Sequence, residues 1–174
     1  FRNGQQTVNN LTAEMRRELT SRIEDKLKSY AETPHAINRL NASAFAQGNI
    51  DVDNAKGEYP FWQQIQIFPS TSFVYCGSER SGEFLGVGKL AGENSLLVRI
   101  NNAFTGDISH FYSLDLKGNR TQLVRKDTKI YDSRIRPWYK AAVAAGQPTW
   151  SEIYLDFTTL LPTVTASLPV YNTT

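Results

Sequence analysis

The first third of the chain has the hydrophobic period of an amphipathic helix. Between Gln5 and Thr33 no proline or glycine interrupts an apolar stripe whose members are spaced three or four positions apart. At about 1.5 Å per residue, this helix would reach on the order of 40 Å. The stripe is narrow, so the helix is expected over residues 1–33 along one surface or paired with a second copy. Its members are Val8, Leu11, Met15, Leu19, Ile23, Leu27 and Tyr30.

Between these alternatives, we expect Leu19 to Tyr30 to pack on the chain's own sheet, with the first turns freer to pair. A second helix is predicted from Pro34 to near Gly48, because Thr33 suits an N-cap and proline suits the first helical position. A short helical or extended segment, Phe61 to Phe68, is expected after a polar loop. The predicted inner face of the second helix is Ile37, Leu40, Ala44 and Phe45.

From Ser72 the pattern changes to that of β-strands. Pro137 and Gly146 bracket one inserted helix, because proline favours a helix start and glycine a helix end. Residues 34–174 are therefore expected to form one α+β module, with a mostly antiparallel sheet and helices to one side. The predicted strands are Ser72–Gly77, Glu83–Lys89, Leu96–Asn101, His110–Leu116, Gln122–Lys126, Trp150–Tyr154 and Thr163–Val170.

Composition and charge narrow the class of protein. The 174 residues are 40% hydrophobic and carry a net charge of +2, which gives no basis for binding nucleic acid. The single cysteine, Cys76, excludes an internal disulfide and is expected as a buried strand residue. No segment resembles a membrane span or a signal peptide. Because the chain starts at Phe1 and stops just after a strand-like run, we expect it to be a piece of a longer protein.

Enzymatic chemistry finds no support in the sequence. The two histidines, His35 and His110, have no partner at a spacing that would place both on one face. We therefore expect no catalytic residue, no metal site and no cofactor.

The segment Tyr131–Tyr139 concentrates the groups that recognise small organic anions. Its sequence, YDSRIRPWY, combines two arginines, one acid and three large aromatic residues at a predicted helix start. A guanidinium can bind a carboxylate through two charge-assisted hydrogen bonds, and aromatic rings supply apolar walls that also attract an ammonium group. The alternative is structural: Arg134 pairs with Asp132, and Trp138 belongs to the core.

Three motifs resemble the double Cache (PAS-like) sensor domains of bacterial transmembrane receptors. They are YDSRIRPWYKAA, PTWSEIY and TVTASLPVY, which lie between Tyr131 and Tyr171. The resemblance implies a long helix packed on a PAS-like sheet, of the membrane-distal type, with the C-terminal part of the family architecture missing. Ser133 departs from the family pattern, which has proline at this position.

In this family, a subset binds α-amino acids through residues that match five positions here. The resemblance implies that Arg136 and Trp138 bind the ligand carboxylate, and that Tyr131, Tyr139 and Tyr154 line the site and contact its ammonium. The family's acidic residue lies beyond Tyr171, and Asp156 is the candidate substitute.

The resemblance also implies a function. We expect the extracytoplasmic sensor domain of a membrane-spanning receptor, whose ligand is an amino acid or another small carboxylate. The output domain would be a histidine kinase, a nucleotide or diguanylate cyclase, or a chemotaxis module. A homodimer through the N-terminal helix is one expected arrangement. The alternative is a structural or dimerisation module of such a receptor, with no small-molecule ligand.

Overall fold

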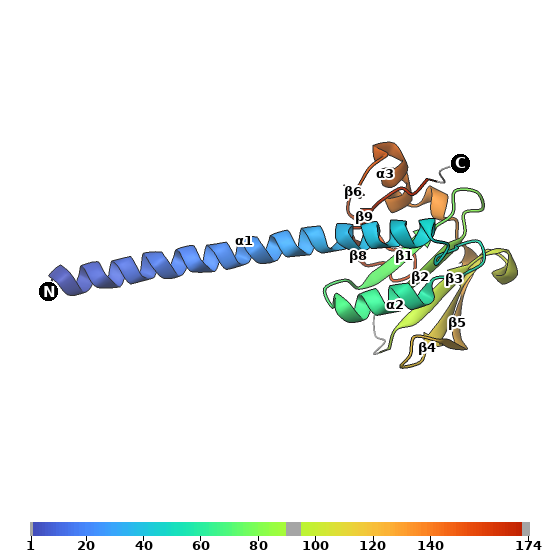
Figure 1. The fold of residues 1–174 in the computed structure, drawn as a ribbon, viewed down its shortest axis with the longest axis horizontal. Helices are drawn as coiled ribbons and strands as arrows, with labels where there is room; N and C mark the ends of the chain where they lie inside the picture. The colour runs from blue at the N-terminus through green and yellow to red at the C-terminus, as the bar shows by residue number, and fades with distance from the viewer. Residues whose placement is uncertain (1, 90–94, 172–174) are drawn as a thin grey trace. The chain divides into compact units, whose positions relative to one another are not determined.

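The computed structural model describes residues 2–89 and 95–171, and the chain divides into two compact units, Phe1–Pro34 and His35–Thr174. Its class is α+β, with a long N-terminal helix and a five-stranded antiparallel sheet (Figure 1). Among the described residues, no helix combines the length and apolar character needed to cross a membrane.

Helix α1 extends over Arg2–Ala46 and contains Pro34 in its interior. The predicted break at Thr33-Pro34 is therefore wrong, because the helix continues through the proline, which removes only its own backbone N–H from the hydrogen-bond ladder. The seven stripe residues are exposed, from 49% for Tyr30 to 63% for Leu27. The expected burial of Leu19 to Tyr30 is also wrong, since the α1 residues that enter the core begin with Ile37.

The second unit contains the sheet and the shorter helices. The β-hairpins predicted around Gly82 and Gly118 are confirmed, and both glycines have positive φ angles, 74° and 78°. The strand order is β1-β2-β3-β4-β5, with every neighbouring pair antiparallel. The elements are α2 (Glu58–Ile67), β1 (Phe73–Gly77), β2 (Phe84–Gly88), β3 (Leu97–Asn101), η1 (Ala103–Thr105), β4 (Ile108–Leu114), β5 (Arg120–Ile130), η2 (Ser133–Ile135) and α3 (Pro137–Ala145).

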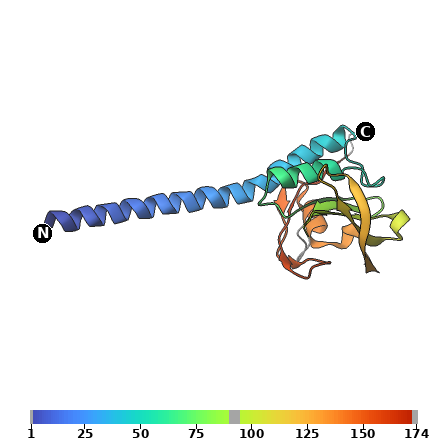
Figure 2. The same ribbon diagram turned by 90° about the horizontal axis from the view of Figure 1, so that it is seen from below.

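The two faces of the sheet carry different clusters, because successive strand residues point to opposite sides. On one face, Val74 and its neighbours in β2 and β3 pack against the end of α1 and against α2. On the other face, Phe84 packs with Tyr131 and with Trp138 of α3. Figure 2 shows the end of α1 and α2 side by side over one face of the sheet, with α3 on the opposite side. The sheet is thus covered on both faces, instead of on one side as predicted.

The predicted inner face of the second helix is only partly correct. Ile37 is buried, but Leu40 is 55% exposed and Asn41 is buried in its place. Asn41 accepts a hydrogen bond of 2.6 Å from the Gln64 side chain of α2. This pair between two helices allows a polar residue to occupy a core position.

The C-terminal segment forms two short ladders instead of two full strands. β6 (Thr149–Trp150) pairs with β9 (Ala166–Ser167), and β7 (Tyr154–Leu155) pairs with β8 (Pro162–Thr163). The longer strands predicted for this region are therefore wrong in extent, although the short strands that form are antiparallel.

Candidate functional site

The segment that follows β5 is fixed to the turn between β1 and β2. The backbone N–H of Ser133 donates to the Gly82 carbonyl at 2.9 Å, and its hydroxyl donates to the Glu83 carbonyl at 3.0 Å. Asp132 caps η2 by accepting from the Arg134 N–H at 2.9 Å. Arg136 then occupies the N-cap position of α3, with Pro137 as the first helical residue. The local sequence thus places Arg136 and Trp138 at one helix start.

Five aromatic side chains form a cluster beside this helix start. Phe84, Tyr131 and Trp138 are buried, and their rings meet edge to face at 5.3 Å for Phe84–Tyr131 and 6.4 Å for Phe84–Trp138. Tyr75 meets Trp138 at 5.0 Å, and Tyr139 meets it at 5.5 Å. The structure therefore brings the predicted residues Tyr131, Trp138 and Tyr139 together on one face of the sheet.

Tyr154 reaches the same cluster through its hydroxyl group. That oxygen lies 3.3 Å from the Tyr75 hydroxyl and 2.8 Å from the Thr165 hydroxyl, and Tyr75 and Thr165 are 2.6 Å apart. These three hydroxyls satisfy one another in a closed network. Burial raises the pKa of Tyr75 well above its ordinary value, so this hydroxyl stays neutral and can both donate and accept hydrogen bonds.

The two arginines of the segment have different surroundings. Arg134 forms an ion pair with Asp132, with 2.7 Å between Nη2 and Oδ2. The guanidinium carbon of Arg136 lies 5.1 Å from the Phe157 ring centroid and 5.8 Å from that of Tyr131. Within residues 2–89 and 95–171, no carboxylate pairs with Arg136 and no acceptor binds its side chain. Its hydrogen-bond donors are therefore available.

A second guanidinium approaches the same rings from the middle of the sheet. Arg99 of β3 is only 3% exposed, and its guanidinium carbon lies 4.0 Å from the Tyr131 ring centroid and 4.5 Å from that of Phe84. Its Nε donates to the Ser109 hydroxyl at 3.0 Å. Its Nη2 is buried without a hydrogen-bond partner in the described part of the chain. A buried cation of this kind is costly unless an anion accompanies it.

The surroundings of Arg99 disfavour its charge. Burial lowers the pKa of Arg99, and the positive charge of Arg136 lowers it further. Tyr131, Asp156 and Asp127 act in the opposite direction. Neither carboxylate lies within ion-pair distance of Arg99 in the described residues, and Asp127 instead pairs with Arg125 at 2.6 Å.

Asp156, the candidate acidic residue of the site, is engaged in a turn. Its Oδ1 accepts from the backbone N–H groups of Thr158 and Thr159, at 3.0 and 2.7 Å, and from the Thr159 hydroxyl at 2.9 Å. These bonds shape the connection between β7 and β8. Asp156 thus acts on Arg99 through its charge, while one of its oxygens is held by the Thr158 and Thr159 donors.

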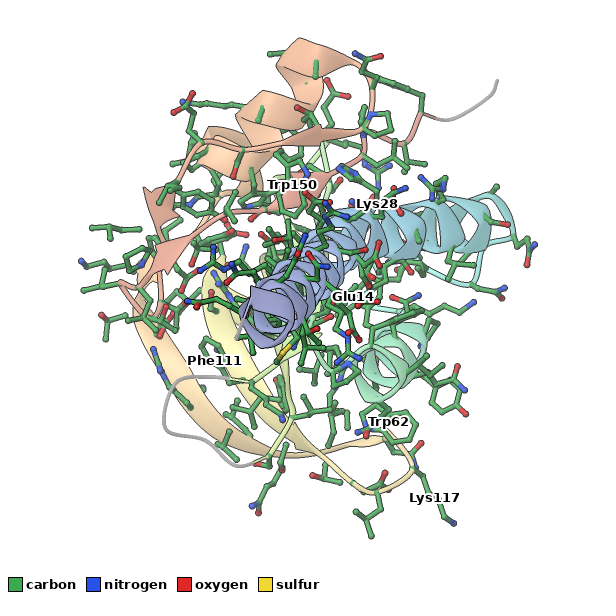
Figure 3. All side chains as sticks on the ribbon, turned by 90° about the vertical axis from the view of Figure 1, so that its left-hand side faces the viewer. Glu14, Lys28, Trp62, Phe111, Lys117 and Trp150 are labelled. Carbon is green, nitrogen blue, oxygen red and sulfur yellow. The ribbon has the colours of Figure 1, made fainter. Side chains whose placement is uncertain are left out.

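Sequence reasoning missed Arg99. The available signal was a charged residue inside the apolar run Leu96-Leu97-Val98-Arg99-Ile100. In a strand buried on both faces, as β3 is, such a residue must find a partner or serve a function. Its neighbours across the sheet, Gly86 and Phe111, come from other strands, so the sequence alone could not place them. Phe111 is labelled in Figure 3.

Among the described residues, no three histidine, cysteine, aspartate or glutamate side chains gather closely enough to hold a metal ion. No family model matches the chain, and no solved structure matches it. This region combines two guanidinium groups, several hydroxyl groups and a wall of aromatic rings.

Proposed function

We propose that this chain is the extracytoplasmic ligand-sensing module of a bacterial membrane receptor, and that it binds a small carboxylate. The proposal draws on the three motifs that resemble double Cache sensor domains, and on the α+β fold. Arg136 would bind the carboxylate, while Trp138, Tyr131, Tyr139 and Tyr154 would line the site. An amino acid is the ligand that the resemblance implies.

The observation that carries this proposal is the difference between Arg134 and Arg136. Arg134 is neutralised by Asp132, whereas Arg136 lies against the Tyr131 and Phe157 rings with no anionic partner among the described residues. A guanidinium flanked by rings and free of an ion pair suits a planar carboxylate, because two parallel N–H···O bonds can form.

The test is a thermal-shift screen of amino acids and small organic acids, followed by calorimetry. A ligand at a hundred times its dissociation constant stabilises the folded state by about 2.7 kcal/mol. Arg136→Ala should abolish the response. Arg134→Ala is the matched control, since it removes a neighbouring guanidinium that is already paired. Equal binding by wild type and Arg136→Ala, for every ligand that binds, would refute the role of Arg136.

A second role, dimerisation, is favoured by the exposed stripe of α1. We propose that the occupant of this stripe is the same helix of a second copy. Val8, Leu19 and Tyr30 recur at eleven-residue intervals, a period that suits paired helices with a slight right-handed supercoil. All seven stripe residues are about half exposed or more, so their apolar surface is free to pair.

A further inference from the structure

We infer that the ligand is a short dicarboxylate, one carboxylate of which is bound by Arg136 and the other by Arg99. This inference rests on the proposed function and specifies its ligand. It changes the expected ligand from a zwitterion with one carboxylate to a dianion.

The first support is the unsatisfied chemistry of Arg99. Its guanidinium is more than nine-tenths buried, Ser109 accepts only from Nε, and Nη2 has no acceptor in the described residues. Arg120 shows what a structural arginine looks like in the same chain: it also lies over a ring, Tyr112, but it pairs with Glu58 at 2.7 Å. Arg99 also lies over aromatic rings, but among the described residues no carboxylate pairs with it as Glu58 pairs with Arg120.

The second support is that the guanidinium groups of Arg99 and Arg136, which have no ion-pair partner among the described residues, share their neighbours. Both lie over the Tyr131 ring, with guanidinium carbons 4.0 and 5.8 Å from its centroid, and both lie near Phe157, at 6.0 and 5.1 Å. The two carbons are therefore at most about 10 Å apart, a separation that a short aliphatic diacid can bridge with one carboxylate on each fork.

The third support is that an ammonium group has a poor partner here. Asp156, whose charge acts on Arg99, has Oδ1 saturated by three donors from Thr158 and Thr159. An ammonium drawn to the remaining oxygen would also feel the charges of Arg99 and Arg136. Two cations facing the same rings repel each other, and a dianion relieves this repulsion where a zwitterion adds another positive charge.

A glycine in the middle of β2 lets aromatic rings pack closely beside the Arg99 guanidinium. In the strand register, Gly86 of β2 lies opposite both Tyr75 of β1 and Arg99 of β3. A Cβ at Gly86 would meet the Tyr75 Cβ at 2.6 Å. Ring atoms of Phe73 and Phe84 would each lie 3.1 Å from the same Cβ, so the glycine makes room for the aromatic rings that surround Arg99 and Tyr75 on this face.

The test compares three probes of the same chain length on the 174-residue protein: succinate, monomethyl succinate and γ-aminobutyrate. They share a four-carbon backbone and one carboxylate, and differ at the other end, which is a carboxylate, a methyl ester or an ammonium group. The methyl ester and the ammonium group cannot form a charge-assisted hydrogen bond with the buried Arg99 guanidinium. Succinate should therefore bind at least about tenfold more tightly than either of the other two probes. Arg99→Gln and Arg99→Lys should reduce this preference to about threefold or less. Arg120→Gln is the matched control and should leave it unchanged.

The outcomes are distinguishable. If monomethyl succinate or γ-aminobutyrate binds as tightly as succinate, and Arg136→Ala abolishes that binding, the dicarboxylate inference is overturned while the proposed function stands. If no carboxylate binds the wild-type chain, both fail. Circular dichroism shows whether each Arg99 variant is folded, and should neither fold, the comparison of the three probes on the wild-type chain decides alone.

Discussion

Gly77, the last residue of β1, offers a sharp test of how the site segment is held. A Cβ built at Gly77 would lie 2.5 Å from the Ser133 Cβ, 2.6 Å from its hydroxyl oxygen and 3.0 Å from the Trp138 ring. Ser133 is fully buried and held by two hydrogen bonds, so it cannot move aside easily. The Gly77 φ angle is not positive, so alanine meets no backbone strain there.

The expected cost of Gly77→Ala follows from two opposing effects. Overpacking a well-packed contact costs about 1–3 kcal/mol. Against this, replacing glycine at a compatible backbone position reduces the entropy of the unfolded chain and contributes about 0.4–1 kcal/mol. We therefore expect the free energy of unfolding to fall by about 1–2 kcal/mol, equivalent to a melting temperature lower by about 3–6 °C in a unit of this size.

The assay is urea denaturation of a double-mutant cycle. Ser133→Gly removes both atoms that the new methyl group would meet most closely, so Gly77→Ala should cost less in that background, with a coupling energy of about 1 kcal/mol. Gly146→Ala is a useful comparison, because Gly146 has a φ of 62° and no atom within 4 Å of its built Cβ. Its cost would arise from the backbone and should be independent of Ser133. Additive effects of Gly77→Ala and Ser133→Gly would refute the close-contact reasoning.

Three further predictions concern charge and association. Arg99→Met should raise the free energy of unfolding without ligand by about 1 kcal/mol, because it removes a buried unpaired cation. If denaturant unfolding shows a clear fall in this free energy, Arg99 has a structural role instead. Burial raises the pKa of Glu83, so the folded chain holds this proton more tightly than the unfolded chain. Stability should therefore fall as pH rises from about 4.5 through the raised pKa, and Glu83→Gln should remove that slope in melting curves. Ile23→Glu should weaken self-association in sedimentation equilibrium; unchanged association would exclude the α1 stripe as its surface.

The predictions that held depend on residues that act locally. Gly82 and Gly118 direct their hairpins through positive φ angles, and Pro137 with Gly146 defines both ends of α3. The aromatic residues of the Tyr131–Tyr139 segment were also brought together as expected, since α3 carries two of them on its first turn. Their role in binding remains a prediction.

The predictions that failed depend on contacts distant in the chain. Leu40 was expected inside because the pattern treats every polar residue as exposed, whereas Asn41 finds Gln64 on another helix. Pro34 was expected to begin a helix, but the turns on either side carry the helix through it. Arg99 escaped attention because its surroundings are assembled from β2, β4 and the segment after β5.

Pro34 also determines where α1 is least stiff. Each turn of an α-helix is joined to the next by backbone hydrogen bonds, and at Pro34 the bond to the Tyr30 carbonyl is missing. This turn should therefore bend more easily than the turns on either side of it. A single proline thus makes one turn of α1 the preferred place for a hinge.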